Sequence, residues 1–112
     1  MKLITAIVRP EKLDDIRTAL EAYGVQGLTL SAASGYGRQR GHTEVYRGAE
    51  YTSDLMPKVR IEILTTEEQA DHIVALILNG SNTGRPGDGK IWITNVDEVI
   101  RVRTGERGPT AI

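Results

Sequence analysis

The chain has 112 residues, a formal net charge of −1 and no cysteine. This length fits one domain, and the balanced charge gives no overall field that favours nucleic acid or a membrane as partner. The lack of cysteine excludes disulfides, thiolate zinc sites and cysteine nucleophiles. The first residues lack the apolar run of a signal peptide, and no segment is long enough to span a bilayer. We therefore expect a cytoplasmic protein.

The N-terminal third predicts a strand, a helix and a second strand. Residues 3–8 carry apolar side chains on both faces of a strand, which predicts a sheet that is covered on both sides. Pro10 suits the first turn of a helix, where a missing N–H costs little, and Gly24 is expected to end this helix. The apolar face of the helix comprises Leu13, Ile16, Leu20 and Tyr23. The second strand is predicted over residues 28–33.

Between Gly35 and Lys58 lies a stretch with no sustained period of 2 or 3.6 residues. Its length of roughly twenty residues exceeds that of ordinary loops, and unstructured loops of such length are usually functional or disordered. It is not a Gly/Ser-rich linker, since it holds long basic side chains (Arg38, Arg40 and Arg47) and three tyrosines. We interpret it as a binding loop; the alternative is a surface insertion without a role.

The second half repeats the pattern of strand and helix. Residues 59–63 alternate apolar and polar side chains, which predicts a strand with one wetter face. Thr66 and Gln69 have the spacing of a capping box that starts a helix, and Gly80 is expected to end it. The buried stripe of this helix comprises Ala70, Ile73, Val74 and Ile77. The remaining predicted strands cover residues 91–94 and 98–104.

The predicted order is strand, helix, strand, long loop, strand, helix, strand, with an extra short strand near the end. Two βαβ units of this kind predict an α+β fold of the ferredoxin-like type, a double βαβ sandwich in which both helices cover one face of an antiparallel sheet. The other face has no third layer to cover it. Because the first strand is apolar on both faces, we expect copies of the chain to pack sheet against sheet in a homo-oligomer.

The turn from Thr83 to Lys90 is rich in glycine and ends on a cation. Residues 84–90 fit the phosphate-binding pattern G-x-x-x-x-G-K, but Ile91 stands where the pattern requires Ser or Thr. The turn also leaves a helix and enters a strand, which is the reverse of a P-loop. Backbone N–H groups between glycines can still converge on an anion, with Lys90 adding charge. The alternative is a plain helix-to-strand turn.

Arg101 and Arg103 lie two residues apart in the predicted strand 98–104, which places both guanidinium groups on one face. A phosphate fits between two such groups, although two solvated arginines are an equally acceptable interpretation of the pair alone. Gln39 and Lys58 stand at the two feet of the long loop. A ligand held there would couple its own binding to the conformation of the loop.

Three motifs in one order resemble the PII family of nitrogen-signalling proteins. Residues 37–51 resemble the exposed T-loop of that family, residues 83–90 its B-loop, and residues 101–106 its C-terminal strand and C-loop. The resemblance extends over residues 1–112. It implies a single PII-like domain with the T-loop at about 37–57, the B-loop at about 82–90 and the C-loop at about 103–112.

The resemblance implies a homotrimer that is not an enzyme and binds ATP or ADP, Mg²⁺ and 2-oxoglutarate in clefts between subunits. The nucleotide-binding residues that it implies are Thr29, Gly35, Gly37, Arg38, Gly87, Asp88, Gly89, Lys90, Arg101 and Arg103. It further implies that Gln39, Lys58 and Arg9 bind 2-oxoglutarate and that Gln39 also binds the metal. The protein would thus report nitrogen, carbon and energy status together.

The implied partners act on or through the long loop. Tyr51 would be uridylylated or adenylylated by a separate nucleotidyltransferase, and Arg47 would contact the cytoplasmic mouth of an ammonium channel. Enzymes or regulators of nitrogen metabolism are further implied targets; nucleic acid is not a partner, and a membrane is reached only through the channel. Pro86 departs from the aliphatic residue usual in the family, and the segment 53–56 is an unusual version of the descending arm of the loop.

Two other functions are weaker interpretations of the same sequence. A ferredoxin-like RNA-binding module needs aromatic side chains on its sheet for base stacking, and the predicted strands offer only Trp92. A nucleotide-hydrolysing enzyme lacks the P-loop hydroxyl and a set of nucleophile, base and orienting residue. His42 and His72, the two histidines, show no spacing typical of metal ligands.

Overall fold

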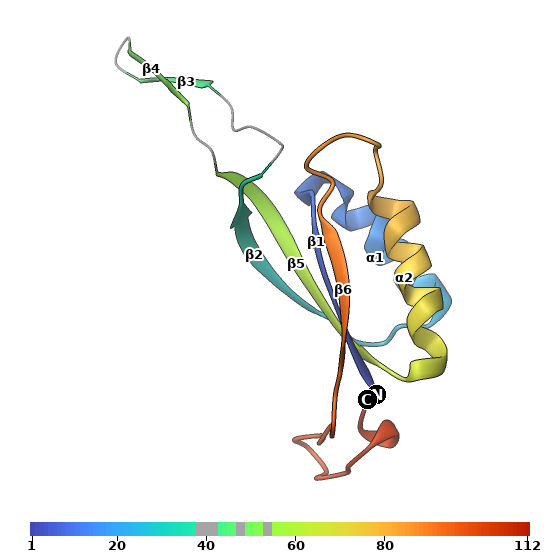
Figure 1. Ribbon diagram of the computed structural model, residues 1–112. Coiled ribbons are helices and arrows are strands. Elements are labelled where there is room, and N and C mark those ends of the chain that lie inside the picture. The colour runs from blue at the N-terminus through green and yellow to red at the C-terminus, as the bar shows by residue number, and fades with distance from the viewer. Residues whose placement is uncertain (38–42, 47–48, 53–54) are drawn as a thin grey trace.

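The computed structural model describes residues 1–37, 43–46, 49–52 and 55–112, and between 43 and 52 it describes only the backbone. Figure 1 shows the arrangement of the elements. They are β1 (Lys2–Val8), the 3-10 helix η1 (Pro10–Lys12), α1 (Leu13–Tyr23), β2 (Thr29–Gly35), β3 (Thr43–Tyr46), β4 (Ala49–Thr52), β5 (Met56–Thr65), α2 (Glu67–Ser81), β6 (Lys90–Asn95) and the 3-10 helix η2 (Pro109–Ala111). In the described part of the chain, no helix is long and apolar enough to cross a membrane.

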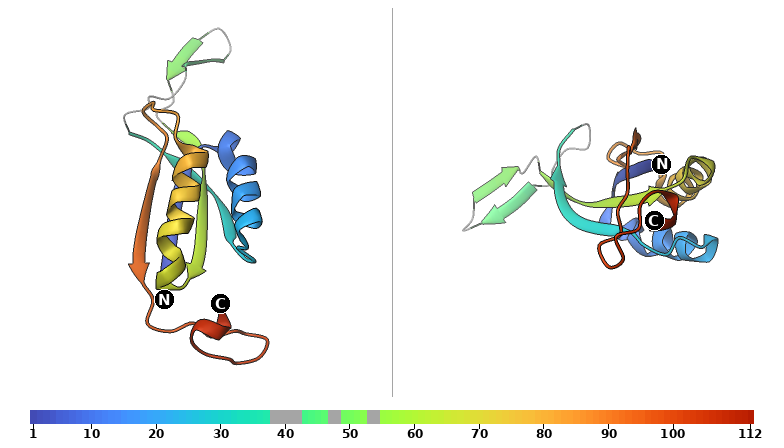
Figure 2. Two further views of the ribbon diagram at one scale, coloured as in Figure 1. Left: turned by 90° about the vertical axis from the view of Figure 1, so that its right-hand side faces the viewer. Right: turned by 90° about the horizontal axis from the view of Figure 1, so that it is seen from below.

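The main sheet has the strand order β2-β5-β1-β6, and every neighbouring pair in it is antiparallel. Helix α1 connects β1 to β2, and α2 connects β5 to β6, so each connection passes over a strand of the other unit. Both helices lie on the same face of the sheet (Figures 1 and 2). The predicted ferredoxin-like α+β fold is therefore confirmed.

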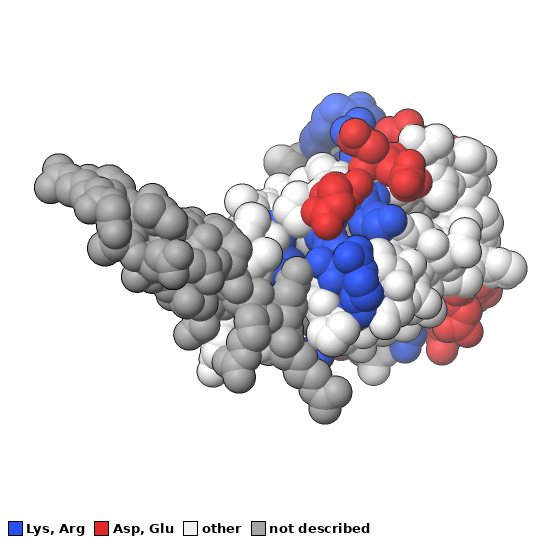
Figure 3. Space-filling model, turned by 90° about the horizontal axis from the view of Figure 1, so that it is seen from above, with Lys and Arg blue, Asp and Glu red and all other residues white. Residues whose placement is uncertain are grey.

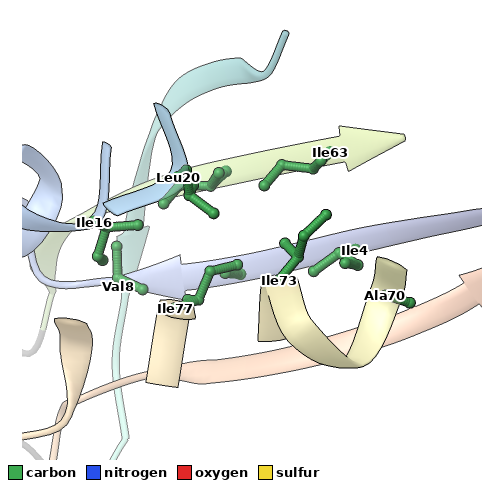
Figure 4. Packing of buried hydrophobic residues seen from close by; sticks show 10 residues of the cluster. Ile4, Val8, Ile16, Leu20, Ile63, Ala70, Ile73 and Ile77 are labelled. Atoms are coloured by element: carbon green, nitrogen blue, oxygen red, sulfur yellow. The ribbon is translucent and has the colours of Figure 1, made fainter. Parts of the chain in front are cut away.

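The core lies between the two helices and the sheet (Figure 4). Its buried side chains are Ile4, Ala6 and Val8 from β1, Ile16 and Leu20 from α1, Ile61 and Ile63 from β5, and Ala70, Ile73 and Ile77 from α2. The period of two along the strands and of three to four along the helices brings these residues to one layer. The chain has no phenylalanine, so the core is aliphatic. Each fully buried aliphatic side chain contributes roughly 1.5–3 kcal/mol to the stability of the fold.

Glycines have different roles at the two helices. Gly24 follows α1 with a φ of 110°, and its N–H bonds to carbonyls of the last turn, so the predicted helix end is confirmed. The prediction that Gly80 ends the second helix was wrong, because α2 continues to Ser81. A Cβ at Gly80 would lie 2.9 Å from Cγ1 of Ile16. Gly80 is thus an inner residue of α2 that allows the two helices to approach closely.

The predicted capping box was only partly right. Thr66 is the N-cap residue of α2 and has extended backbone angles, but its side chain forms no capping hydrogen bond. The Gln69 side chain is engaged elsewhere, since its Oε1 accepts a hydrogen bond from the Tyr23 hydroxyl. The tyrosine ring in turn stacks on His72 with 5.9 Å between centroids. A contact between the helices therefore replaced the local cap that the spacing suggested.

The face of the sheet opposite the helices carries an apolar patch. Register pairs place Leu3 opposite Leu64 and Thr5 opposite Trp92 on this face. Leu64 and Trp92 are 40% and 41% exposed, so this face is only partly covered in the described part of the chain. Trp92 is also the single aromatic side chain that the described strands present on this face, which leaves little for an RNA base to stack on.

The long loop contains regular structure, contrary to the prediction. β3 and β4 pair antiparallel in a separate two-stranded sheet, with Thr43 opposite Thr52 and Tyr46 opposite Ala49. Figure 1 shows this hairpin projecting away from the sandwich, and the molecule extends 58 Å along its longest axis but only 27 and 22 Å along the others. Each strand has four residues, which is the minimum length over which an alternating pattern is recognised.

The predicted strand at 98–104 was wrong. Its alternating apolar residues suggested a strand, but the chain turns back on itself: the Gly105 N–H bonds to the Arg101 carbonyl at 2.7 Å, and the Arg101 N–H bonds to the Glu106 carbonyl at 2.9 Å. Gly105 has a φ of 74°, which favours such a reversal. Consequently Arg101 and Arg103 do not share a strand face, and the argument from their spacing fails.

Candidate functional site

The turn between α2 and β6 is organised by the carboxylate of Asp88. Oδ1 accepts a hydrogen bond from Arg9 Nε at 3.1 Å and another from the Thr83 hydroxyl. Oδ2 accepts from the N–H groups of Thr83 and Gly84 at 2.7 and 2.9 Å. These bonds, first those from the Thr83 hydroxyl and N–H, hold the pKa of Asp88 well below its ordinary value. The carboxylate thus ties the start of the turn to its end.

Glycine is required at the end of the turn by a close approach of two backbones. Gly89 has a φ of 104°, and a Cβ there would lie 1.7 Å from the carbonyl oxygen of Ile7. Ile7 belongs to β1, a central strand of the sheet, and pairs with Lys90 at the start of β6. The turn therefore lies directly against the sheet, and only a residue without a side chain fits at this position.

A pocket of about 520 Å³ lies between this turn and the end of β2. It is lined by Ile7, Gly35, Tyr36, Gly37, Lys58, Pro86, Gly87, Gly89, Lys90 and Trp92. The structure thus brings together six of the residues that the resemblance implicated in ligand binding: Gly35, Gly37, Lys58, Gly87, Gly89 and Lys90. The lining includes two lysines and no carboxylate among the described residues, so it suits an anion. Figure 3 views this end of the molecule and shows Lys and Arg side chains gathered next to Asp and Glu side chains.

Lys58 and Arg9 connect the sheet to the turn. The Lys58 ammonium donates to the Gly87 carbonyl at 2.6 Å, and Arg9 Nη2 donates to the Pro86 carbonyl at 2.8 Å. Both residues are buried, with 9% and 7% of their surface exposed. Burial, followed by the nearby charge of Arg9, lowers the pKa of Lys58 from its usual value. An anion in the pocket would offset both effects.

A second pocket, of about 920 Å³, lies at the opposite end of the sheet. Its lining includes Thr29 together with Gly27, Leu28, Glu62, Leu64 and Ile112. Of these residues only Thr29 was identified from the sequence. The others come from the α1–β2 connection, the C-terminal half of β5 and the last residue of the chain, and no local motif marks them as neighbours.

Arg101 lies near this second pocket and is held by its own segment. Its Nη1 donates to Glu106 Oε1 at 3.2 Å, and its Nη2 donates to the Thr110 and Ile112 carbonyls at 2.9 and 3.3 Å. Because Ile112 lines the second pocket, Arg101 reaches the rim of that pocket through it. Arg103 lies in the turn that follows and is exposed.

The residues predicted to bind nucleotide therefore divide into two groups within one chain. Lys90 starts β6, whereas Arg101 follows the other end of that strand (Figure 1). Likewise, Thr29 and Gly35 stand at opposite ends of β2. A strand of six or seven residues spans roughly 20 Å, so one phosphate group cannot reach Lys90 and Arg101 of the same chain.

Four predicted residues are not placed by the structure. Arg38, Gln39 and Arg47 lie outside the described residues, and Tyr51 lies in β4, of which only the backbone is described. Among the residues whose side chains are described, no group of three or more His, Asp or Glu could hold a metal ion. A cation at the 520 Å³ pocket would need ligands other than the described acidic side chains.

Comparison with known proteins identifies the family. A family model described as "Nitrogen regulatory protein P-II" matches residues 1–106. Among the relatives, the nitrogen regulatory protein P-II of Rhizobium meliloti strain 1021 is 54% identical, that of Azospirillum brasilense is 50% identical, and the nitrogen regulatory protein GlnK of Escherichia coli K12 is 46% identical. Each comparison covers 112 residues and the full length of both chains. The chain, with its ferredoxin-like fold and its cationic glycine-rich turn, belongs to the P-II family of nitrogen regulatory proteins.

Proposed function

We propose that the protein senses adenine nucleotides and 2-oxoglutarate in clefts between copies of a homotrimer, and that it regulates nitrogen metabolism through the loop at residues 37–57. The observation that carries this proposal is the division of the candidate site. A cationic turn with Lys90 lies at one end of β6, and Arg101 lies beyond the other end, near the pocket that holds Thr29. Two copies packed through their open sheet faces, with one half of each copy beside the other half of its neighbour, would join these halves into one nucleotide site.

The first half suits the phosphates of the nucleotide. Lys90 and Lys58 supply positive charge at a pocket that is also lined by Gly87 and Gly89. Glycines let the backbone approach a phosphate closely, and cations add electrostatic attraction. Arg101 and Arg103 of a neighbouring copy would complete the set. For this to happen, Arg101 would exchange part of its present bonding to Glu106 for a bond to phosphate.

The second half suits the base of the nucleotide. Its walls include Leu28, Leu64 and Ile112, together with Thr29 and Glu62 as polar members. A mostly apolar pocket with a few polar groups is the usual setting for a small aromatic ligand. We infer that the adenine ring binds here, with Thr29 offering a hydrogen bond that distinguishes one base from another.

Mg²⁺ belongs to the same proposal. The 520 Å³ pocket is lined by no described carboxylate, so the residues fit a metal that arrives with a triphosphate and not a bare ion. When bound, Mg²⁺ would neutralise phosphate charge and provide coordination sites for the oxo acid. Gln39 would supply a side-chain oxygen to it, and Lys58 would pair with a carboxylate of 2-oxoglutarate. Because both residues stand at the feet of the loop, ligand binding would select a loop conformation.

The homotrimer is supported by the open face of the sheet. Leu64 and Trp92 expose about two-fifths of their surface there, next to Leu3 of the central strand. Apolar patches of this kind usually mark an interface, and copies packed by rotation about one axis would bury all of them equally. The same packing would bring the two halves of the candidate site together.

The regulatory output belongs to the loop that carries β3 and β4. The hairpin stands away from the sandwich (Figure 1), so it can reach a partner while the sheet face is buried. We propose that it contacts an ammonium channel through Arg47, that enzymes or regulators of nitrogen metabolism also bind it, and that a nucleotidyltransferase modifies Tyr51. A nucleotidyl group would add bulk and negative charge to the contact surface. The protein would act in the cytoplasm and not as an enzyme.

A complementation experiment tests the divided site. Lys90→Met and Arg103→Met should each abolish most ATP binding in calorimetric titrations. When the two variants are co-expressed, they mix at random in symmetric rings. About a quarter of the clefts then receive an intact Lys90 from one copy and an intact Arg103 from its neighbour, and ATP binding should return to that extent. A site within one chain would give no recovery, and this result would contradict the proposal. Light scattering should give the mass of a trimer.

A second titration tests the effector. 2-Oxoglutarate should bind in the presence of Mg-ATP and much more weakly with Mg-ADP or without nucleotide, because the implied metal bridge needs the triphosphate. Binding can be followed by the fluorescence of Trp92, the only tryptophan, which lines the cationic pocket. Equal affinity under all three conditions would count against the metal bridge at Gln39.

A further inference from the structure

The resemblance assigns Arg9 to the binding of 2-oxoglutarate, but its contacts indicate another role. We propose that Arg9 is a positioning residue, which holds the glycine-rich turn in the conformation that binds phosphate. This inference rests on the proposed nucleotide site and concerns how that site is built. It follows from three features: the bonds of the guanidinium, the direction of the peptide groups in the turn, and the distribution of charge.

The guanidinium of Arg9 is engaged on two sides by the turn. Nε donates to Asp88 Oδ1 at 3.1 Å, and Nη2 donates to the Pro86 carbonyl at 2.8 Å. The side chain is only 9% exposed, so little of it is left for a soluble ligand. The two acceptors flank Gly87 on both sides in the sequence. Arg9 thus fixes the residues before and after this glycine.

The peptide groups of the turn are oriented by cations of the sheet. Arg9 holds the carbonyl of Pro86, and Lys58 holds the carbonyl of Gly87 at 2.6 Å. In a trans peptide the N–H points opposite to the carbonyl. The N–H of Gly87 therefore points away from Arg9, and the N–H of Asp88 points away from Lys58. Neither N–H donates to another residue in the described part of the chain, so both are available to an anion.

The charge of Arg9 is largely used within the protein. Its ion pair with Asp88 balances one positive charge by one negative charge, so the pair contributes geometry more than attraction for an anion. Asp88 in turn binds Thr83 and Gly84 at the start of the turn. Arg9 is thereby connected to the whole turn through a single carboxylate, whereas Lys90 is left as a charge that lines the pocket.

Arginine suits this role better than lysine. A guanidinium has donors in a rigid fork, so one side chain can hold a carboxylate and a carbonyl in fixed directions. A lysine at this position would keep the charge but could hold the two acceptors less rigidly. The chemistry therefore predicts that charge alone does not replace Arg9, which distinguishes a positioning role from simple electrostatic attraction.

The test measures ATP affinity in the absence of 2-oxoglutarate, using the full-length protein. Arg9→Met should weaken ATP binding about tenfold or more, because it removes two hydrogen bonds that fix the turn, one of them to a charged group, and Arg9→Lys should fall between this variant and the unmodified protein. Arg17→Met is the matched control: Arg17 forms an exposed pair with Glu21 at 3.8 Å on α1 and should leave ATP affinity unchanged. If Arg9→Met binds ATP normally and loses only 2-oxoglutarate, Arg9 is a direct ligand of the effector and the proposal is overturned.

Two further measurements separate positioning from general stability. In a double-mutant cycle, Arg9→Met and Asp88→Asn should be strongly non-additive for ATP binding, since both break the same connection; additive effects would contradict the proposal. Amide hydrogen exchange across residues 84–90 should accelerate in Arg9→Met while exchange in β1 and β5 stays unchanged. Unchanged exchange in the turn would overturn the proposal, and this readout needs no nucleotide, so it decides the question even if the proposed function fails.

Discussion

The contact of Gly89 with the central strand predicts a large effect for the smallest possible substitution. In Gly89→Ala the new Cβ would lie 1.7 Å from the carbonyl oxygen of Ile7 and 2.8 Å from its carbonyl carbon. Both are backbone atoms of β1, which is paired on either side by β5 and β6, so no side-chain rotation relieves the clash. A non-glycine residue at this positive φ also costs about 1–3 kcal/mol in backbone strain.

The control for this experiment is Gly84→Ala in the same turn. Gly84 also has a positive φ, of 78°, but a Cβ there meets nothing within 4 Å. It should lose only the strain term, about 1–2 kcal/mol, whereas Gly89→Ala should lose that term and at least about 2 kcal/mol more from displaced backbone. Against a total stability of about 5–15 kcal/mol for a typical domain, this difference is large.

The assay is urea unfolding followed by the fluorescence of Trp92, with the slope m checked for constancy. Gly89→Ala should unfold at a clearly lower urea concentration than Gly84→Ala, and it should also lose ATP binding because the turn must leave the sheet. Equal midpoints for the two variants would refute the reasoning. They would mean that the approach of the turn to Ile7 is not needed for the folded state.

Three other predictions follow from the packing and the charges. Gly80→Ala should lower the urea midpoint although alanine favours a helix by about 1 kcal/mol, because its Cβ would meet Ile16 Cγ1 at 2.9 Å; a raised midpoint would contradict this. Burial and the charge of a neighbouring arginine lower the pKa of Lys58 from 10.5. Calorimetry should therefore show that the affinity for 2-oxoglutarate falls as the pH rises through this lowered pKa. The free energy of unfolding should rise between the lowered pKa and 10.5, because the unfolded chain binds the proton more readily there. Lys58→Arg should remove both pH dependences. Hydrogen bonds from Thr83, followed by those from other donors, lower the pKa of Asp88. The ionised carboxylate therefore stabilises the fold above pH 3.8, and this stabilisation is lost as the pH falls below that value. Urea midpoints of Asp88→Asn should decline less steeply in acid than those of the unmodified protein.

The parts of the fold that follow from short-range periodicity were predictable. Ile4, Ala6 and Val8 alternate with less buried residues along β1 and all enter the core. Ile16 and Leu20 lie one helical turn apart and are fully buried. In both elements the side-chain period follows from backbone geometry alone, so the pattern of apolar residues was enough to predict which face is inside.

Errors arose where a distant contact or a turn decided the outcome. Glycine is typical of a helix end, but Gly80 lies within α2 and is needed because Ile16 of α1 approaches it closely. The alternation of residues 98–104 is typical of a strand, yet the reversal around Gly105 pairs Ile100 with Arg107 in a single bridge. The pairing of β3 with β4 was missed for a different reason, since each strand has only the minimum length over which alternation is counted.

For the candidate site, the residue types were visible in the sequence, but their grouping was not. The glycines and Lys90 of the turn lie within a few residues of one another, so a motif could indicate an anion site there. The approach of Lys58 to Gly87, the engagement of Arg9 by Asp88 and the pocket around Thr29 depend on residues far apart along the chain.

The amino-acid sequence alone determined the order of the strands and helices of the sandwich, the apolar faces that form the core, the glycine-rich cationic turn and the family. Only the tertiary structure decided that Arg9 is engaged by the turn, that Gly80 is a contact between helices, and that Lys90 and Arg101 lie at opposite ends of β6. The physical reason is the range of the interactions. Periodicity and turn chemistry are properties of neighbouring residues, whereas burial, ion pairs and the two halves of a site arise when the sheet brings distant segments side by side.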